Sequence, residues 1–214
     1  MIAGTTTVLL DGNLIRENGT TGKCLQYSST GTRNLQMSKM YFYNENYMTF
    51  QVGSNLEDIY DFGGSIFESG PNATINTVRL SYSNFRNFTV IGRSSQTALF
   101  LTNTAKASGF TVLAKGTGNG ITTQTGIFAT SVYVESNSGN AISGGELSNF
   151  VARSVSGIAV SGPNSAHDFV ATTGNNYAVT MGVAEISNFR AENNSSTLPC
   201  INLTNTLQCV QGYV

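Results

Sequence analysis

The densest group of acidic side chains in the chain lies between Glu57 and Asp61, with Glu68 a few residues further on. Glycoside hydrolases use two carboxyl groups about 5–9 Å apart, one as general acid and the other as base or nucleophile. In a strand, Glu57 and Asp61 would share one face and Asp58 and Tyr60 the other, because successive side chains alternate. Asp58 and Asp61 are therefore the candidate catalytic residues of a polysaccharide hydrolase. A charged loop is the alternative.

Aromatic side chains that could bind sugars are concentrated just before this run. Tyr41, Tyr43 and Tyr47 lie within seven residues of one another. Tyrosine offers a flat apolar ring together with a polar hydroxyl group, so these residues could stack on sugar rings. The alternative is that they fill the end of the hydrophobic core.

The remaining reactive residues form no catalytic or metal-binding motif. His167 is the single histidine and has no serine or cysteine motif beside it, which favours a turn residue over a catalytic base. Cys24, Cys200 and Cys209 are odd in number and lack the spacing of a metal or redox site. Cys200 is most simply a small core residue, with a Cys200–Cys209 disulfide as the alternative. No metal and no cofactor is expected.

The elements that must position any site follow a repeat of about twenty residues. Seven segments open with Phe or Val and carry a small or branched apolar residue two positions later. Their first residues are Phe88, Phe110, Val132, Phe150, Phe169, Phe189 and Val210. A repeat of this length is typical of a solenoid, in which each unit buries its apolar face by stacking on its neighbours. The leucine pattern of a leucine-rich repeat and the apolar spacing of an α-solenoid are both missing.

Each repeat has two further apolar positions. One lies three residues before the first apolar residue of the repeat, at Phe85, Ala107, Ala129, Leu147, Ala166, Ile186 and Leu207. The other is a small–aliphatic pair about ten residues later, beginning at Ala98, Gly120, Ala141, Gly157, Ala178 and Cys200. Three short strands joined by turns would place all three positions inward. We therefore predict an all-β, single-domain parallel β-helix over residues 1–214, with roughly ten coils. Residues 1–76 would form irregular coils or a cap, and residues 77–214 the regular coils.

Turn-forming residues precede the first apolar position of most repeats. Asn87, Gly109, Asn149, Asp168 and Asn188 occupy this place, and such residues tolerate a left-handed backbone. Stacked at one corner, Asn149, Asp168 and Asn188 would form a short ladder of polar side chains.

The register of the repeat also places one polar group on the outer surface. Glu135 and Arg153 each lie three residues after the first apolar position of consecutive coils. Adjacent strands are about 4.8 Å apart, so the two side chains should be neighbours, with Tyr133 beside them. An aromatic ring next to fixed hydrogen-bonding groups suits a sugar-binding subsite. The alternative is a solvated cross-strand ion pair of little energetic value.

Two aliphatic residues point outward on successive coils. Ile91 and Leu113 occupy the position that Glu135 and Arg153 take further along the chain. Apolar patches on a surface usually mark interaction sites, so a partner subunit is expected to cover them. A loop from the amino-terminal region is the alternative.

The composition of the chain indicates which partners and which location to expect. Charged residues make up 11% of the chain, the net charge is −1, and no basic cluster with interleaved aromatics occurs, so nucleic acid is not an expected partner. The first ten residues lack the features of a signal peptide, and no segment has the length of a membrane span. A low charge with abundant Ser, Thr, Asn and Gly is common in proteins on virions or outside cells. We expect a virion or extracellular surface, reached by lysis or as part of a longer protein.

The repeated anchors and turns resemble the right-handed parallel β-helix of pectate lyases and bacteriophage tailspikes. The resemblance covers residues 77–214 clearly and residues 1–76 loosely. It implies a homotrimer that is attached to other virion proteins and binds host surface polysaccharide along a lateral groove. A polysaccharide-degrading enzyme of the same fold, a hydrolase or a lyase, is the first alternative, and a purely structural shaft is the second. The Asp cluster by which pectate lyases bind calcium is missing from these coils.

Overall fold

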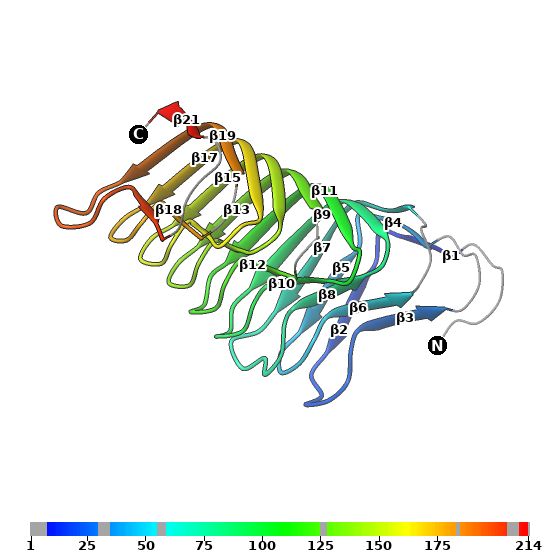
Figure 1. Cartoon of the computed structure of the whole chain (residues 1–214). Helices are drawn as coiled ribbons and strands as arrows, with labels where there is room; N and C mark the ends of the chain where they lie inside the picture. Colours follow the sequence, from blue (N-terminus) through cyan, green and yellow to red (C-terminus); the bar gives the residue numbers. More distant parts are fainter. Residues whose placement is uncertain are drawn as a thin grey trace.

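The chain forms an elongated parallel β-solenoid, with its first and last described strands at opposite ends of the stack (Figure 1). The structure is a computed structural model that describes residues 8–29, 35–54, 59–124, 128–182, 185–204 and 210–213. Across these ranges every residue in regular structure is in a strand, and no helix occurs. The predicted all-β parallel solenoid is therefore confirmed.

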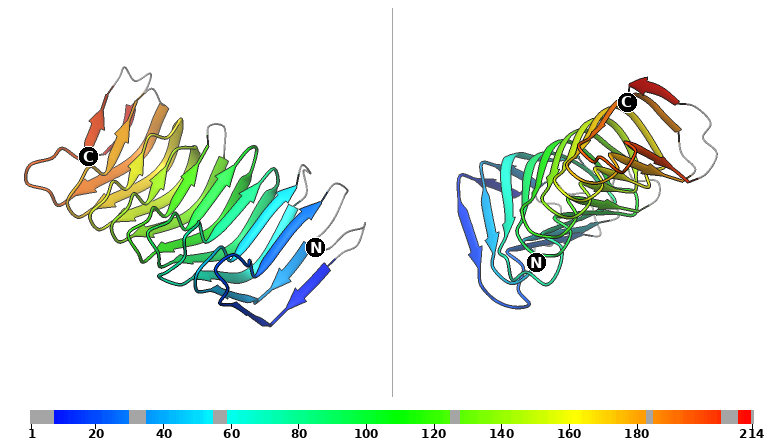
Figure 2. Two further views of the ribbon diagram at one scale, coloured as in Figure 1. Left: turned by 90° about the horizontal axis from the view of Figure 1, so that it is seen from below. Right: turned by 90° about the vertical axis from the view of Figure 1, so that its left-hand side faces the viewer.

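Two sheets run along the length of the molecule (Figure 2). We call the first the long-strand sheet; it contains, in spatial order, β2 (Leu14–Glu17), β5 (Tyr41–Asn44), β7 (Ile59–Ser69), β9 (Asn84–Gly92), β11 (Lys106–Ala114), β13 (Phe128–Ser136), β15 (Glu146–Ser154), β17 (Ser165–Thr173), β19 (Glu185–Asn193) and β21 (Val210–Tyr213). The short-strand sheet contains β3 (Leu25–Ser29), β6 (Phe50–Ser54), β8 (Val78–Ser81), β10 (Leu99–Thr102), β12 (Ile121–Thr123), β14 (Ile142–Ser143), β16 (Val160–Ser161), β18 (Val179–Met181) and β20 (Ile201–Leu203). A separate parallel pair joins β1 (Val8–Asp11) to β4 (Leu35–Ser38).

The solenoid has about seven turns of roughly 22 residues, so the predicted ten coils were too many. Seven long strands, from β7 to β19, mark these turns. The strands before β7 are only four or five residues long, and β21 has four. The chain ends therefore add shorter, incomplete turns, which a count based on chain length treats as full ones.

Each regular long strand bends at one residue with a left-handed backbone. These corner residues are Asn87, Gly109, Ser131, Asn149, Asp168 and Asn188, with φ between 50° and 60°. Asn, Asp and Gly reach this conformation at low cost, as predicted from their position. The bend divides each long strand into two straight segments that lie on different sides of the solenoid. Together with the short strand, each turn therefore has three sides. The predicted ladder exists as separate pairs, with Asn188 donating to Asp168 and the Asn149 amide donating to Ser131 Oγ at 3.3 Å.

The first apolar positions form one buried stack next to the corners. Phe88, Phe110, Val132, Phe150, Phe169 and Phe189 are all at most 5% exposed. Ring centroids are 4.9 Å apart for Phe88 and Phe110, and 4.8 Å apart for Phe150 and Phe169. This confirms the predicted inward position of these residues.

Two predicted positions were wrong. Val210 pairs with Ile186, and Gly212 takes the place opposite Phe189 after a register shift. In the short-strand sheet, Val160 pairs with Ile142 and Val179, so Ala159 and Val160 fill the place predicted for Gly157 and Ile158.

Hydroxyl side chains inside the solenoid donate hydrogen bonds to backbone carbonyl groups in the tight turns that follow the long strands. Ser136 Oγ donates to the Gly118 carbonyl at 3.3 Å, Ser154 Oγ to Gly139 at 2.9 Å, and Thr173 Oγ1 to Gly157 at 2.8 Å. Buried polar groups are costly without such partners. In the part of the chain that the structure describes, no helix is long and apolar enough to cross a membrane.

Candidate carbohydrate-binding groove

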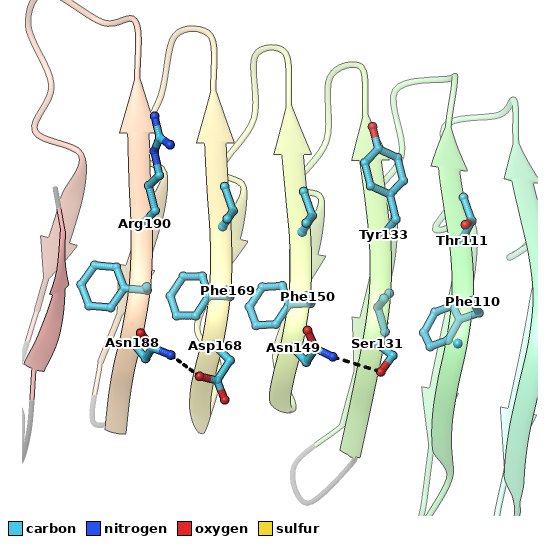
Figure 3. A pocket seen from close by; sticks show the side chains of 15 residues that line it. Phe110, Thr111, Ser131, Tyr133, Asn149, Phe150, Asp168, Phe169, Asn188 and Arg190 are labelled. Carbon is cyan, nitrogen blue, oxygen red and sulfur yellow. Dashed lines mark hydrogen bonds between the residues drawn. The ribbon is translucent and has the colours of Figure 1, made fainter.

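An open groove of about 760 Å³ runs across five consecutive long strands, from β11 to β19 (Figure 3). We call it the corner groove. One wall is formed by the corner residues Gly109, Ser131, Asn149, Asp168 and Asn188. The other wall, which we call the first outer row, consists of Thr111, Tyr133, Val151, Val170 and Arg190. With strands about 4.8 Å apart, the groove is about 19 Å long.

The bend in each strand creates this groove. In β15, the corner residue Asn149 and the outer residue Val151 both point outward, while Phe150 between them points into the core. The surface is therefore hollow above the inward-pointing residue. Because the same three-residue pattern recurs on each of the five turns, the hollows join into a continuous groove.

The two walls differ in chemistry. Hydroxyl, amide and carboxylate groups of Ser131, Asn149, Asp168 and Asn188 line the corner wall. The first outer row offers a tyrosine ring and the methyl groups of Val151 and Val170, and it ends at Arg190. Arg190 is paired with Glu192, its Nε lying 2.7 Å from Glu192 Oε1. Sugar rings have hydroxyl edges and less polar faces, so a groove with one polar wall and one partly apolar wall can contact both.

Tyr133, Glu135 and Arg153 come together at one side of the groove, as the register predicted. The Tyr133 hydroxyl donates to Glu135 Oε2 at 2.9 Å, and the Arg153 Cζ lies 5.8 Å from the centroid of the Tyr133 ring. Lys115 Nζ donates to Glu135 Oε1 at 2.8 Å. The solvated cross-strand ion pair considered as the alternative therefore exists at Glu135, with Lys115 in place of Arg153 as its partner.

The charge states in this group follow from these contacts. Hydrogen bonds from Lys115 and Tyr133 lower the pKa of Glu135, although burial opposes this. Burial and the hydrogen bond to Glu135 raise the pKa of Tyr133. At neutral pH the group therefore presents a neutral phenol, a carboxylate and two cations. Sequence reasoning missed Lys115, which immediately follows β11 and reaches Glu135 on the next turn.

The carboxylates proposed for hydrolysis lie elsewhere. Asp58 falls outside the described residues. Asp61 accepts hydrogen bonds from Arg86 Nε at 2.9 Å and from Asn87 Nδ2 and Gly63 N, both at 3.0 Å. Burial alone would raise the pKa of Asp61, but these hydrogen bonds lower it, so the group stays ionised and is poorly suited to be a general acid.

Glu68 belongs to a different set of contacts, further along β7, beyond Gly63 and Gly64, which have positive φ. Its carboxylate accepts from Arg93 Nε at 2.5 Å and from the Tyr41 hydroxyl at 2.7 Å. Burial and this hydrogen bond raise the pKa of Tyr41 to about 12. Both carboxylate oxygens of Glu68 are therefore used within the protein.

Tyr41 and Tyr43 lie on the outer surface of β5, and Phe42 between them is fully buried. The core-filling alternative is therefore wrong for both tyrosines. Tyr47 is partly buried in the turn after β5, where its backbone N–H donates to Asn44 Oδ1 at 3.0 Å.

The histidine and cysteines take structural positions. His167 was predicted in a turn but lies within β17 beside the corner residue Asp168, with its Nδ1 2.7 Å from Ser187 Oγ. Cys200 is partly buried and packs against the core, as expected, whereas Cys209 falls outside the described residues. Among the residues described, no group of three His, Cys, Asp or Glu side chains could hold a metal ion.

The sequence matches no protein-family model, no curated protein and no solved structure. The class of protein defined by the chain itself is a parallel β-solenoid with a lateral groove across five turns.

Proposed function

We propose that this chain is a polysaccharide-binding module of a virion or cell surface, and that the glycan lies along the corner groove. The observation that carries the proposal is the length and repetition of the groove. Its two walls are built from the same two strand positions on each of five turns, as a polysaccharide is built from successive units. A glycan lying across the strands could place successive sugars on successive turns.

The tailspike-like, right-handed and trimeric form of such a module is part of this proposal. It is supported by the parallel solenoid, the low fraction of charged residues of 11%, and the outward-facing aliphatic side chains. A structural shaft that binds no sugar would not need a continuous groove with one polar and one partly apolar wall.

We favour binding over hydrolysis because of where the acidic residues lie. Among the described residues that line the corner groove, Asp168 is the single carboxylate. Glycoside hydrolysis generally requires two. Asp61 does not line the groove and is held by Arg86, Asn87 and Gly63. If the hydrolase alternative were correct, Asp58→Asn or Asp61→Asn would abolish cleavage of a bound glycan and retain its binding.

Tyr133→Ala and Arg153→Ala should each weaken glycan binding roughly tenfold, because a few aromatic and arginine side chains dominate such sites. Both residues are on the outer surface, so the thermal midpoint should change little. The ligand would first be identified on an array of neutral and acidic glycans, with product analysis for cleavage. Affinities would then be measured by calorimetry.

The matched control for both variants is Arg79→Ala on the short-strand sheet. Arg79 also lies over an aromatic ring, with its Cζ 5.7 Å from the Phe100 centroid, but it lies on the other sheet, away from both the groove and Arg153. This control should bind like the wild-type chain. If a ligand is identified and both Tyr133→Ala and Arg153→Ala leave its affinity unchanged, the glycan binds elsewhere.

The oligomeric state gives a separate prediction. Ile91 and Leu113 pair on adjacent strands and remain partly exposed on the outer surface. We expect a homotrimer in which a neighbouring subunit covers them, because removing apolar surface from water is favourable. Light scattering should give three times the chain mass, and Leu113→Lys should shift the species toward monomer. A wild-type monomer would contradict the trimer and leave the groove proposal intact.

A further inference from the structure

A second hollow of about 320 Å³ lies beside the corner groove, where β13, β15 and β17 end. Its lining includes Glu135, Arg153, Val155, Thr172 and Asn194. Tyr133 and Val151, in the first outer row, lie two residues before Glu135 and Arg153 on the same strands, so that row is the ridge between hollow and groove. We call this second site the Arg153 hollow. A substituent of a glycan bound in the groove would need to cross only this ridge.

Arg153 brings to the hollow a guanidinium that forms no ion pair within the described part of the chain. Arg16 and Arg79 form none there either, whereas Arg86, Arg93 and Arg190 each pair with a carboxylate. Arg153 lies against Tyr133, with Cζ 5.8 Å from the ring centroid, and it also interacts with the Tyr133 hydroxyl. A guanidinium has five N–H donors, so contact with a ring and one hydroxyl leaves others for a ligand.

The neighbouring charges preserve this positive site. Glu135 is beside Arg153 in the sheet register, but its two oxygens are engaged by Lys115 and Tyr133. The formal charges of Lys115, Glu135 and Arg153 leave an excess of one positive charge. The remaining lining adds the Thr172 hydroxyl, the Asn194 amide and the exposed methyl groups of Val155.

We propose that the Arg153 hollow binds the carboxylate of an acidic sugar, of the uronate or sialate class, in the glycan that occupies the corner groove. This inference rests on the proposed function of the groove. A planar guanidinium matches a carboxylate with two parallel hydrogen bonds, which gives both affinity and selectivity. The hydroxyl and amide groups can then bind the sugar hydroxyls, and Val155 can contact the apolar face of the ring.

The test compares alginate, hyaluronan and polysialic acid, each with its carboxyl-reduced counterpart, and neutral dextran and galactomannan. Binding to the full chain is measured by calorimetry at two salt concentrations. We expect at least one acidic polymer to bind about tenfold tighter than its reduced form, because a hydrogen bond to a charged group is worth at least that factor. Arg153→Gln should remove this preference, and Arg153→Lys should retain part of it.

Arg79→Gln is the matched control, because it removes an arginine stacked on an aromatic ring outside both sites. It should keep the full preference for the acidic polymer. Equal affinity for acidic and reduced forms, or an acidic preference that survives Arg153→Gln, would overturn the inference while leaving the groove proposal standing. Absence of binding by every polymer in this panel and by the neutral and acidic glycan array would overturn both.

Discussion

Phe150→Ala is expected to lower the free energy of unfolding by about 3–5 kcal/mol. The Phe150 ring is 3% exposed and stacks on Phe169 with centroids 4.8 Å apart. On its other side it adjoins Val132 in the register of the long-strand sheet. Truncation would remove contacts to both neighbouring turns and leave a cavity that the backbone cannot close, because strand hydrogen bonding fixes the spacing of the turns. Equilibrium urea unfolding followed by circular dichroism would measure the loss.

Val151→Ala is the matched control, one residue further along the same strand. Val151 points outward into the corner groove and is only partly buried, so its truncation creates no internal cavity. Surface changes of this kind usually cost about 0.5 kcal/mol or less. Equal losses from the two variants would mean that the Phe stack is not the source of stability.

The inward Phe and Val positions could be predicted from the sequence because every turn must place an apolar side chain of similar size against those of its neighbours. A residue at Phe110 must fit the space left by Phe88, and the alternation of strand side chains then fixes which neighbours point outward. The corner residues could be predicted for the same reason, since each must adopt a positive φ.

The predicted positions were wrong where two neighbouring pairs of residues fit the pattern equally well. The predicted number of turns was wrong because part of the chain lacks the repeat. Gly157-Ile158 and Ala159-Val160 are both small–aliphatic pairs, and the pattern alone does not distinguish them. The structure does, because Gly157 lies in a turn where a side chain would overlap the Gly139 carbonyl. The predicted number of turns was too high because the short strands before β7 do not carry the full repeat.

The candidate site was predictable only in part. Tyr133, Glu135 and Arg153 follow from the register, which places their strands side by side. The pairing of Glu135 with Lys115 does not, because Lys115 follows the end of β11 and its reach depends on the shape of the turn. The corner groove was also missed as a groove. Its depth comes from the bend at each corner residue, and a pattern of inward and outward positions along a straight strand does not describe that bend.

Gly118 offers the second large effect, in the turn between β11 and β12. A Cβ atom at this position would overlap the backbone oxygen of Gln96, in the equivalent turn of the preceding coil. The carbonyl of Gly118 in turn accepts the hydrogen bond from Ser136 inside the solenoid. Gly118→Ala must therefore push two stacked turns apart or distort both, and we expect a loss of roughly 2–3 kcal/mol in the free energy of unfolding.

Gly109→Asn separates this close approach from the general effect of replacing a glycine. Gly109 is a corner residue with φ of +60°, and Asn87, Asn149 and Asn188 occupy the same corner with φ of 50° to 59°. An added Cβ would lie 3.2 Å from Asn87 Oδ1, a side-chain atom that can adjust. Asparagine can also form hydrogen bonds with the polar side chains along the corner, and it reduces the conformational freedom of the unfolded chain. The free energy of unfolding of this variant should therefore be within about 0.5 kcal/mol of the wild-type value, or higher. A Gly118→Ala variant as stable as Gly109→Asn would mean that the turns of neighbouring coils are not packed backbone against backbone.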